Sequence, residues 1–152
     1  MEYPILSING KRLYPPPPPH NPDDAVLWAI QTGDTAALDK AIDSHANLRK
    51  KVKAGDVECT ALHLAAKSGN VKAVKLIIKA LDTGDMNAQD SFGETAVHWA
   101  ARADKDKALE ALIEGGCSVE VESSDGTTPI KCAVDNHANA ALKRLIKRMA
   151  QL

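Results

Sequence analysis

In this 152-residue chain, a histidine next to a tryptophan is the arrangement that most suggests catalysis or metal binding. The segment TAVHWAA, residues 95–101, contains His98 and Trp99. An imidazole is a common general base and metal ligand. The chain lacks the G-x-x-x-x-G-K, G-x-S-x-G and H-E-x-x-H patterns that would place such a group in a known type of catalytic site. We therefore expect no catalytic residue, no metal, no cofactor and no small-molecule substrate.

The same seven-residue block recurs at a regular spacing. TALHLAA begins at residue 60 and TPIKCAV at residue 128, and a more divergent copy covers residues 25–42. After each block, apolar residues follow at spacings of three and four, which places them on one face of a helix. This period indicates stacked helical units. A histidine that recurs, as His63 and His98, does not suit a unique catalytic centre, and no acid or cysteine repeats beside it to form a metal site.

These units resemble the ankyrin repeat family, whose first helix opens with T-P-L-H-x-A-A. The resemblance implies an all-α solenoid of helix-turn-helix units with β-turn fingers, and four repeats at about residues 23–55, 56–90, 91–123 and 124–152. It also implies that the histidine of each block links adjacent fingers through backbone hydrogen bonds. The structural repeat positions are Thr60, His63, Gly69, Thr95, His98 and Thr128.

The turn between the two helices of a repeat departs from the family pattern. Gly33 and Gly69 occupy this turn in the first two repeats, and Asp104 and His137 replace the glycine in the other two. Aspartate and histidine tolerate a positive φ angle better than most residues. We therefore expect these two replacements to affect the stability of the domain more than its fold.

Binding in this family generally uses the concave face and the finger tips, so the resemblance places candidate partner contacts there. Phe92, the only phenylalanine, falls at a finger turn, where it either anchors a partner or folds onto the neighbouring finger. Trp99 is expected in helix packing, with a role as a binding anchor as the alternative. The other candidates around this finger are Ser91, Glu94 and Arg102.

A basic cluster distinguishes the first finger. Arg49, Lys50, Lys51 and Lys53 lie within five residues. Such a cluster either attracts an acidic partner or is simply solvated, and the sequence leaves both interpretations open.

The last helix is also basic, with Lys143, Arg144, Lys147 and Arg148. Terminal repeats need a polar outer face to remain soluble. We expect a C-terminal cap of this kind, with contact to anionic lipid as the alternative.

Residues 1–22 form a separate proline-rich arm. Prolines at positions 15–19 favour a polyproline II rod, which is either a docking motif or a stiff spacer. Arg12, Pro15 and Pro18 resemble an SH3 ligand, and Tyr14 opens a YPPPP sequence that resembles a weaker EVH1 ligand. Upstream, Asn9 and Gly10 between short alternating segments predict a β-hairpin.

Composition narrows the possible partners and compartment. A formal net charge of −1 offers no broad positive face, so we expect no nucleic acid partner. Cys59, Cys117 and Cys132 have no paired spacing, which favours a reducing compartment, the cytoplasm or the nucleus. No apolar run reaches the roughly 20 residues that a spanning helix needs, so we expect no membrane insertion.

The expected function is a non-catalytic protein–protein interaction module or scaffold, an accessory subunit of a larger assembly. It would bind through the concave face and the fingers, with the N-terminal arm as a second docking element. The alternative is an inhibitor or regulator that masks the surface of a partner enzyme or transcription factor. A catalytic role for His63 or His98 ranks last.

Overall fold

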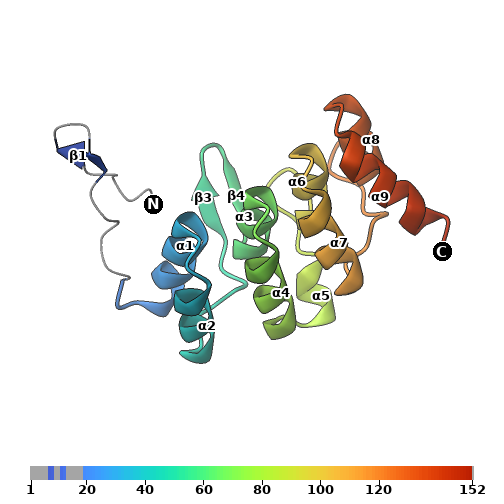
Figure 1. Cartoon of the computed structure of the whole chain (residues 1–152). Helices are drawn as coiled ribbons and strands as arrows, with labels where there is room; N and C mark the ends of the chain where they lie inside the picture. The colour runs from blue at the N-terminus through green and yellow to red at the C-terminus, as the bar shows by residue number, and fades with distance from the viewer. Residues whose placement is uncertain (1–6, 9–10, 13–18, 152) are drawn as a thin grey trace.

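Helix pairs are stacked side by side along one direction, with the N-terminal and C-terminal repeats at opposite ends (Figure 1). The computed structural model describes residues 7–8, 11–12 and 19–151. The helices are α1 (Pro22–Thr32), α2 (Thr35–Asp43), α3 (Ala61–Ser68), α4 (Val71–Ala80), α5 (Thr83–Met86), α6 (Ala96–Arg102), α7 (Asp106–Glu114), α8 (Pro129–Asp135) and α9 (Asn139–Met149). The strands are β1 (Ser7–Ile8), β2 (Lys11–Arg12), β3 (Val52–Ala54) and β4 (Val57–Cys59). An all-α solenoid is confirmed.

Each repeat turns between its helices through a left-handed residue. Gly33 and Gly69 end α1 and α3 with φ angles of 77° and 75°. Asp104 and His137 take φ angles of 54° and 55° at the equivalent turns, so all four repeats have a left-handed residue there. In the third repeat the Oδ1 atom of Asp104 also accepts a hydrogen bond from the Ala141 amide at 2.9 Å, which connects this turn to the next repeat.

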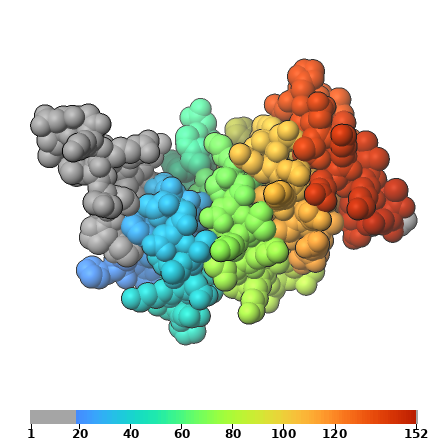
Figure 2. Space-filling view, in the orientation of Figure 1, coloured from blue at the N-terminus to red at the C-terminus, as the bar shows by residue number. Residues whose placement is uncertain are grey.

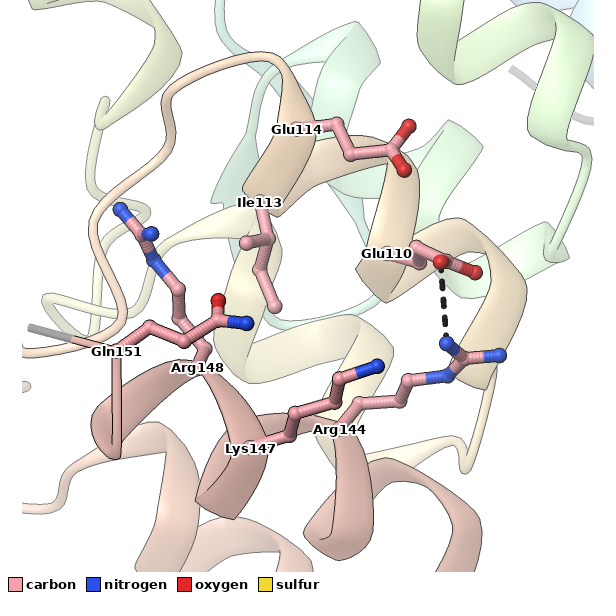
Figure 3. Close-up of a pocket in the computed structure, with 7 residues that line it drawn as sticks. All are labelled: Glu110, Ile113, Glu114, Arg144, Lys147, Arg148 and Gln151. Atoms are coloured by element: carbon pink, nitrogen blue, oxygen red, sulfur yellow. Dashed lines mark ion pairs between the residues drawn. The ribbon is translucent and has the colours of Figure 1, made fainter.

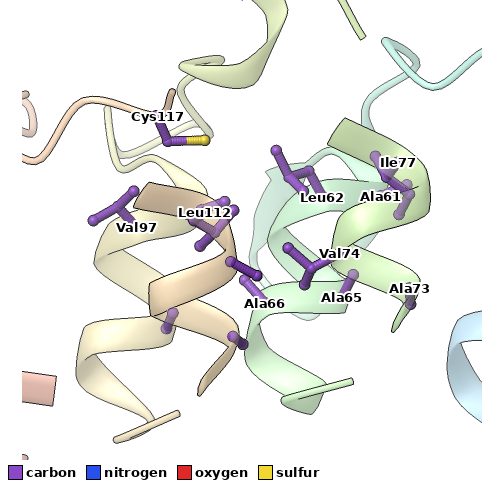
Figure 4. Close-up of a cluster of buried hydrophobic side chains, with 14 of the residues drawn as sticks. Ala61, Leu62, Ala65, Ala66, Ala73, Val74, Ile77, Val97, Leu112 and Cys117 are labelled. Carbon is purple, nitrogen blue, oxygen red and sulfur yellow. The ribbon is translucent and has the colours of Figure 1, made fainter. Parts of the chain in front are cut away.

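The core consists of aliphatic side chains and many alanines, which allow the helices to lie close together. Ala65 and Ala66 of α3 are fully buried, as are Val74 and Ile77 of α4. Figure 4 shows these side chains beside Leu112 of α7, so the core continues across the junction between repeats. This arrangement explains how a chain with 3% aromatic residues has a continuous interior.

The first finger is a short β-hairpin rather than a simple β-turn. β3 and β4 are antiparallel, with Val52 opposite Cys59 and Ala54 opposite Val57. Gly55 begins the turn with a φ angle of 67°, a conformation that glycine adopts without steric cost. This finger therefore still reverses through a β-turn, at Gly55 and Asp56, and its longer sequence adds a short strand on each side.

The second repeat contains an additional helical turn, α5, where the sequence predicted only two helices per unit. It follows α4 directly, after Leu81 and Asp82. Four residues that include a glycine carry no helical periodicity, so the pattern gave no sign of this turn.

At the N-terminus, β1 and β2 are antiparallel, with Ser7 opposite Arg12 and Ile8 opposite Lys11. The predicted strand pairing is confirmed, while its turn at Asn9 and Gly10 lies outside the described residues. The polyproline prediction, with Tyr14 and the prolines at positions 15 and 18, and the side chain of Arg12 also lie outside them.

Candidate functional site

The two buried histidines connect adjacent fingers. The Nδ1 atom of His98 accepts a hydrogen bond from the Thr95 amide at 3.0 Å, so its Nε2–H donates to the carbonyl oxygen of Thr127 at 2.9 Å. His63 repeats this geometry, at 3.2 Å from the Thr60 amide and 2.9 Å from the carbonyl oxygen of Glu94. Both imidazoles are thus occupied on both nitrogens and hold the next finger in place.

Burial lowers the pKa of His63 and of His98 below the ordinary value of 6.5. Both side chains are at most 1% exposed. Protonation would add a hydrogen to Nδ1, where the imidazole now accepts from a backbone amide. The neutral form is therefore the form that suits this structure.

Trp99 is held by a carboxylate of the preceding finger. The Nε1–H group of Trp99 donates to Oδ2 of Asp90 at 2.8 Å, and the tryptophan is only 8% exposed. The other oxygen of Asp90 accepts from the amides of Phe92 and Glu94 at 2.9 and 2.8 Å. His63 meets the indole ring edge-on, with centroids 5.3 Å apart. Trp99 is thus part of the packed interior, and only a small part of the indole is exposed to solvent.

The structural role of Asp90 was not predicted from the sequence. Its position at the start of the finger turn, two residues before Phe92 and four before Glu94, is typical of an aspartate that binds nearby backbone amides. That spacing could have identified it as the residue that shapes the finger, although not as the partner of Trp99.

A shallow groove lies on the side of the fingers, between the first hairpin and the ends of two first helices. Its lining residues are Val57, Lys67, Trp99, Arg102 and Ala103. The ammonium nitrogen of Lys67 lies 6.0 Å from the centroid of the Trp99 ring. Arg102 is paired with the carboxylate of Glu94, and this hydrogen bond raises the pKa of the guanidinium further. The groove therefore has an apolar floor and a basic edge.

The tip of the second finger is exposed. Phe92 is 57% exposed, so its ring is not folded onto the neighbouring finger. Ser91 instead fixes the finger to the first hairpin, since its amide donates to the Glu58 carbonyl at 3.0 Å and its hydroxyl accepts from the Glu58 amide at 3.0 Å. The backbone of Phe92 accepts a bond from the Ser124 amide in the next finger. The fingers thus form a connected row with Phe92 protruding from it.

The basic cluster of the first finger does not form one free patch. Arg49 makes ion pairs with Asp82 at 3.0 Å and Asp85 at 2.7 Å, next to and within α5. Lys50 lies 3.9 Å from Asp23. In the part of the chain that the structure describes, Lys51 and Lys53 form no ion pair. The cluster is thus divided, because Arg49 lies beside the carboxylates of the following repeat.

The expected polar cap at the C-terminus is wrong. Arg144 points back toward α7, where it pairs with Glu110 at 3.0 Å and Asp106 at 3.8 Å (Figure 3). Val134, Ile146 and Met149 are left exposed on the outer side. Arg144, Lys147 and Arg148 line a groove toward α7 and leave these apolar side chains uncovered.

The cysteines offer no reactive group. Cys59, Cys117 and Cys132 are unpaired and buried, and burial raises the pKa of the Cys59 and Cys117 thiols to about 11. Among the described residues no cluster of histidine, cysteine and carboxylate side chains could hold a metal ion. No helix within those residues is long and apolar enough to cross a bilayer.

Helix pairs stacked at a period of 33 to 36 residues, and joined by fingers, define a helical repeat protein. Family models identify the kind of repeat. A model of three ankyrin repeats matches residues 77–152, and a single ankyrin repeat matches residues 58–91. The chain belongs to the ankyrin repeat family.

Similar curated proteins share only this repeat region. The chain is 35% identical to human diacylglycerol kinase iota over 113 residues, which are 74% of this chain and 10% of the kinase. It is 26% identical to dog inversin over 124 residues, 81% of this chain and 11% of inversin. It is 34% identical to human neurogenic locus notch homolog protein 1 over 94 residues, 61% of this chain and 4% of that protein. The chain thus spans about a tenth or less of these relatives.

Ankyrin repeats are generally protein–protein interaction modules and are typically non-catalytic. The geometry described above is compatible with that general role. The groove adjoins the row of fingers through Val57, and both imidazoles are engaged in holding this row together.

Proposed function

We propose that this chain is a non-catalytic protein-binding module or scaffold, an accessory subunit of a larger assembly, which binds a protein through its finger tips and concave groove. The observation that carries the proposal is the exposed ring of Phe92 in the same finger as Asp90, whose carboxylate holds Trp99 in the floor of the groove. An exposed aromatic ring is the kind of anchor found at protein interfaces.

The chemistry of the groove suggests what it would bind. Val57, Trp99 and Ala103 supply an apolar floor, and Lys67 supplies a charge that no described ion pair neutralises. Arg102 is already paired with Glu94. We expect a partner segment that inserts an apolar side chain and places a carboxylate near Lys67.

The N-terminal arm is proposed as a second docking element. Its prolines at positions 15 and 18, with Arg12 and Tyr14, would offer a rigid ligand to an aromatic-lined groove, because a polyproline rod loses little entropy on binding. The arm would allow one chain to connect two components.

The groove is tested by quantitative co-purification from native extract with the full chain. Phe92→Ala and Lys67→Glu should each remove the same partner, while Lys107→Glu, at an exposed position of α7 outside the groove, should leave it bound. Recovery of an unchanged set of partners by both groove variants would contradict the proposal.

The arm is tested in the same experiment with Pro15→Ala combined with Pro18→Ala. Loss of a second partner, with the groove partner retained, supports a docking arm. Retention of every partner by this variant identifies the arm as a spacer and refutes its docking role.

We also propose a reducing compartment, the cytoplasm or nucleus, as the location. Three buried and unpaired cysteines support it, because thiols persist where disulfides are kept reduced. Fluorescence imaging of the tagged protein in its native cells would check this location.

A further inference from the structure

The outer face of the fourth repeat has the composition of an interface between repeats. Val134 stands at the repeat position of Ile30, Ala66 and Ala101, which the following repeat buries to 7% exposure or less. Val134 itself is 51% exposed. Ile146 is 54% exposed, whereas its three counterparts are partly buried against the core. We call this surface the end face, and it consists of Ile130, Val134, Leu142, Ile146 and Met149.

The junctions inside the molecule show how such a face is covered. Ile78 of α4 packs against Gly115 at the end of α7, so closely that an added Cβ atom would lie 2.6 Å from the Ile78 Cγ2 atom. Ile146 occupies the position of Ile78 in the fourth repeat, and Ser44 occupies the position of Gly115 in the first repeat. At this junction a large apolar residue on one repeat thus meets a small residue on the next.

The first repeat carries the small-residue side of this pattern. A groove between α1 and α2 is lined by Ala25, Ala37, Ala41 and Ser44, together with Pro22 and Lys40, and on one side by Pro19 and His20 of the segment before α1. One of these positions, Ser44, corresponds to Gly115, which meets Ile78 of the preceding repeat. The α1–α2 face thus offers small side chains where the end face offers large ones.

Charges on the second helices alternate in sign from repeat to repeat. Two positions, one helical turn apart, carry acids in the first and third repeats and lysines in the second and fourth. The pairs are Asp39 and Asp43, Lys75 and Lys79, Glu110 and Glu114, and Lys143 and Lys147.

Opposite charges consequently face each other across the grooves between second helices. Asp39 lines one such groove with Lys72 and Lys75. Figure 3 shows the equivalent groove between α7 and α9, where Glu110 and Glu114 lie opposite Arg144, Lys147 and Arg148. The last pair in the series, Lys143 and Lys147, has no acidic pair beyond it among the described residues.

We propose that the end face docks head to tail onto the α1–α2 face of a second copy of this chain. This arrangement places Lys143 and Lys147 next to Asp39 and Asp43 of the other copy, which continues the alternation of charge and places Ile146 near Ser44. An end face against an identical end face would instead bring lysines against lysines, so charge selects the head-to-tail contact.

The hydrogen bonds between fingers are also compatible with a head-to-tail contact. His63 and His98 each bind a carbonyl group in the following finger. The fourth repeat has Lys131 at this position and the sequence before α1 contains no glycine turn within residues 13–21. A junction made by helices alone therefore leaves no finger contact unsatisfied. Figure 2 shows that the C-terminal repeat forms one extreme end of the molecule.

The test is sedimentation equilibrium of the full chain over a range that reaches hundreds of micromolar. A head-to-tail contact does not close on itself, so the average mass should keep rising with concentration and not stop at a dimer. Lys143→Glu with Lys147→Glu should weaken association at least tenfold, as should Asp39→Lys with Asp43→Lys. An equal mixture of the two variants should restore it, because each presents the complement of the other.

A matched control and a second measurement distinguish a lost contact between copies from a variant that does not fold. Lys53→Glu with Lys107→Glu changes the charge equally at exposed sites outside both end surfaces and should leave association unchanged. With the native charges retained, Ser44→Cys and Ile146→Cys variants should form a mixed disulfide on oxidation. The native cysteines are buried.

A chain of constant mass at every concentration would overturn the inference, as would a predominance of Ile146→Cys homodimers. Phe92→Ala should not alter self-association, because the concave groove is a separate surface. Loss of a groove partner and loss of self-association are thus distinguishable outcomes.

Discussion

Replacing His98 with alanine should destabilise the domain in a pH-dependent manner. The substitution leaves the Thr95 amide and the Thr127 carbonyl without their partner, in a place where the imidazole is fully buried. Each orphaned group costs about 1 kcal/mol at the low end of the usual range, and the space left by the ring costs about 1 kcal/mol more. We expect His98→Ala to lower the free energy of unfolding by about 3 kcal/mol at pH 7.5, or the melting temperature by about 6–12 °C.

The difference between wild type and variant should shrink in acid. Burial lowers the pKa of folded His98 below 6.5, so the unfolded chain binds more protons than the folded chain once the pH falls below 6.5. Stability from the neutral imidazole is therefore complete above pH 6.5 and is lost as the pH falls toward the folded pKa. One histidine accounts for up to about 1.4 kcal/mol of this loss at pH 5.5. The variant has no imidazole at this position and does not lose this stability, so the difference in free energy of unfolding between wild type and variant should fall to about 2 kcal/mol.

The assay is urea unfolding followed by circular dichroism at pH 7.5 and 5.5. His20→Ala, which changes an exposed histidine outside the helices, serves as the control and should match the wild type within about 0.5 kcal/mol. The reasoning is refuted by a deficit below about 1 kcal/mol, which would mean that the bonds to Thr95 and Thr127 contribute little. If the variant loses the same free energy of unfolding at pH 7.5 and at pH 5.5, the conclusion that His98 is neutral in the folded protein is refuted.

Three further substitutions test the local geometry through thermal or urea unfolding. Gly93→Ala should lower the free energy of unfolding at least twice as much as Gly126→Ala. Both residues have positive φ, but an added Cβ at Gly93 would lie 2.6 Å from a backbone nitrogen of the next finger, whereas Gly126 has open space. Equal losses of stability would contradict this contact. His137→Gly should stabilise the domain by about 0.5–1 kcal/mol because glycine adopts its φ of 55° without strain, and any loss of stability would argue against a strained turn. Trp99→Phe should cost about 1–3 kcal/mol because it leaves the Asp90 carboxylate without the indole donor, and an unchanged unfolding midpoint would show that this bond is dispensable.

The repeat register, the helix pairs and the left-handed turns follow from sequence because each depends on local pattern. His137 replaces a glycine and still adopts a positive φ, since the helices on both sides fix the turn. Three similar copies of one block also reinforce one another, so a departure in one copy does not obscure the period.

Contacts between residues far apart in sequence could not be predicted in the same way. Arg49 pairs with Asp82 and Asp85 only because stacking brings the first finger beside α5, and α5 itself has no periodic pattern. The bond from Trp99 to Asp90 likewise depends on how the finger folds against α6. Such pairings are set by three-dimensional geometry, which a single sequence does not reveal.

The end face shows why counting charges along a helix misled the prediction of a polar cap. α9 has four basic residues, yet solubility of an end depends on which direction each side chain takes around the helix. Arg144 turns toward α7 to meet Glu110, and the positions at spacings of three and four that face outward hold Leu142, Ile146 and Met149. The same helix is therefore basic along its edges and apolar at its end.

Because each repeat of a solenoid contacts only its neighbours, the groove and the end face can act independently. The groove depends on β4, α3 and α6, whereas the end face belongs to α8 and α9. A partner seated on Phe92 would leave Ile146 free, and copies joined end to end would present their grooves at regular intervals along one side. Self-association would then multiply weak contacts to a repetitive partner into strong overall binding, without any change in the groove.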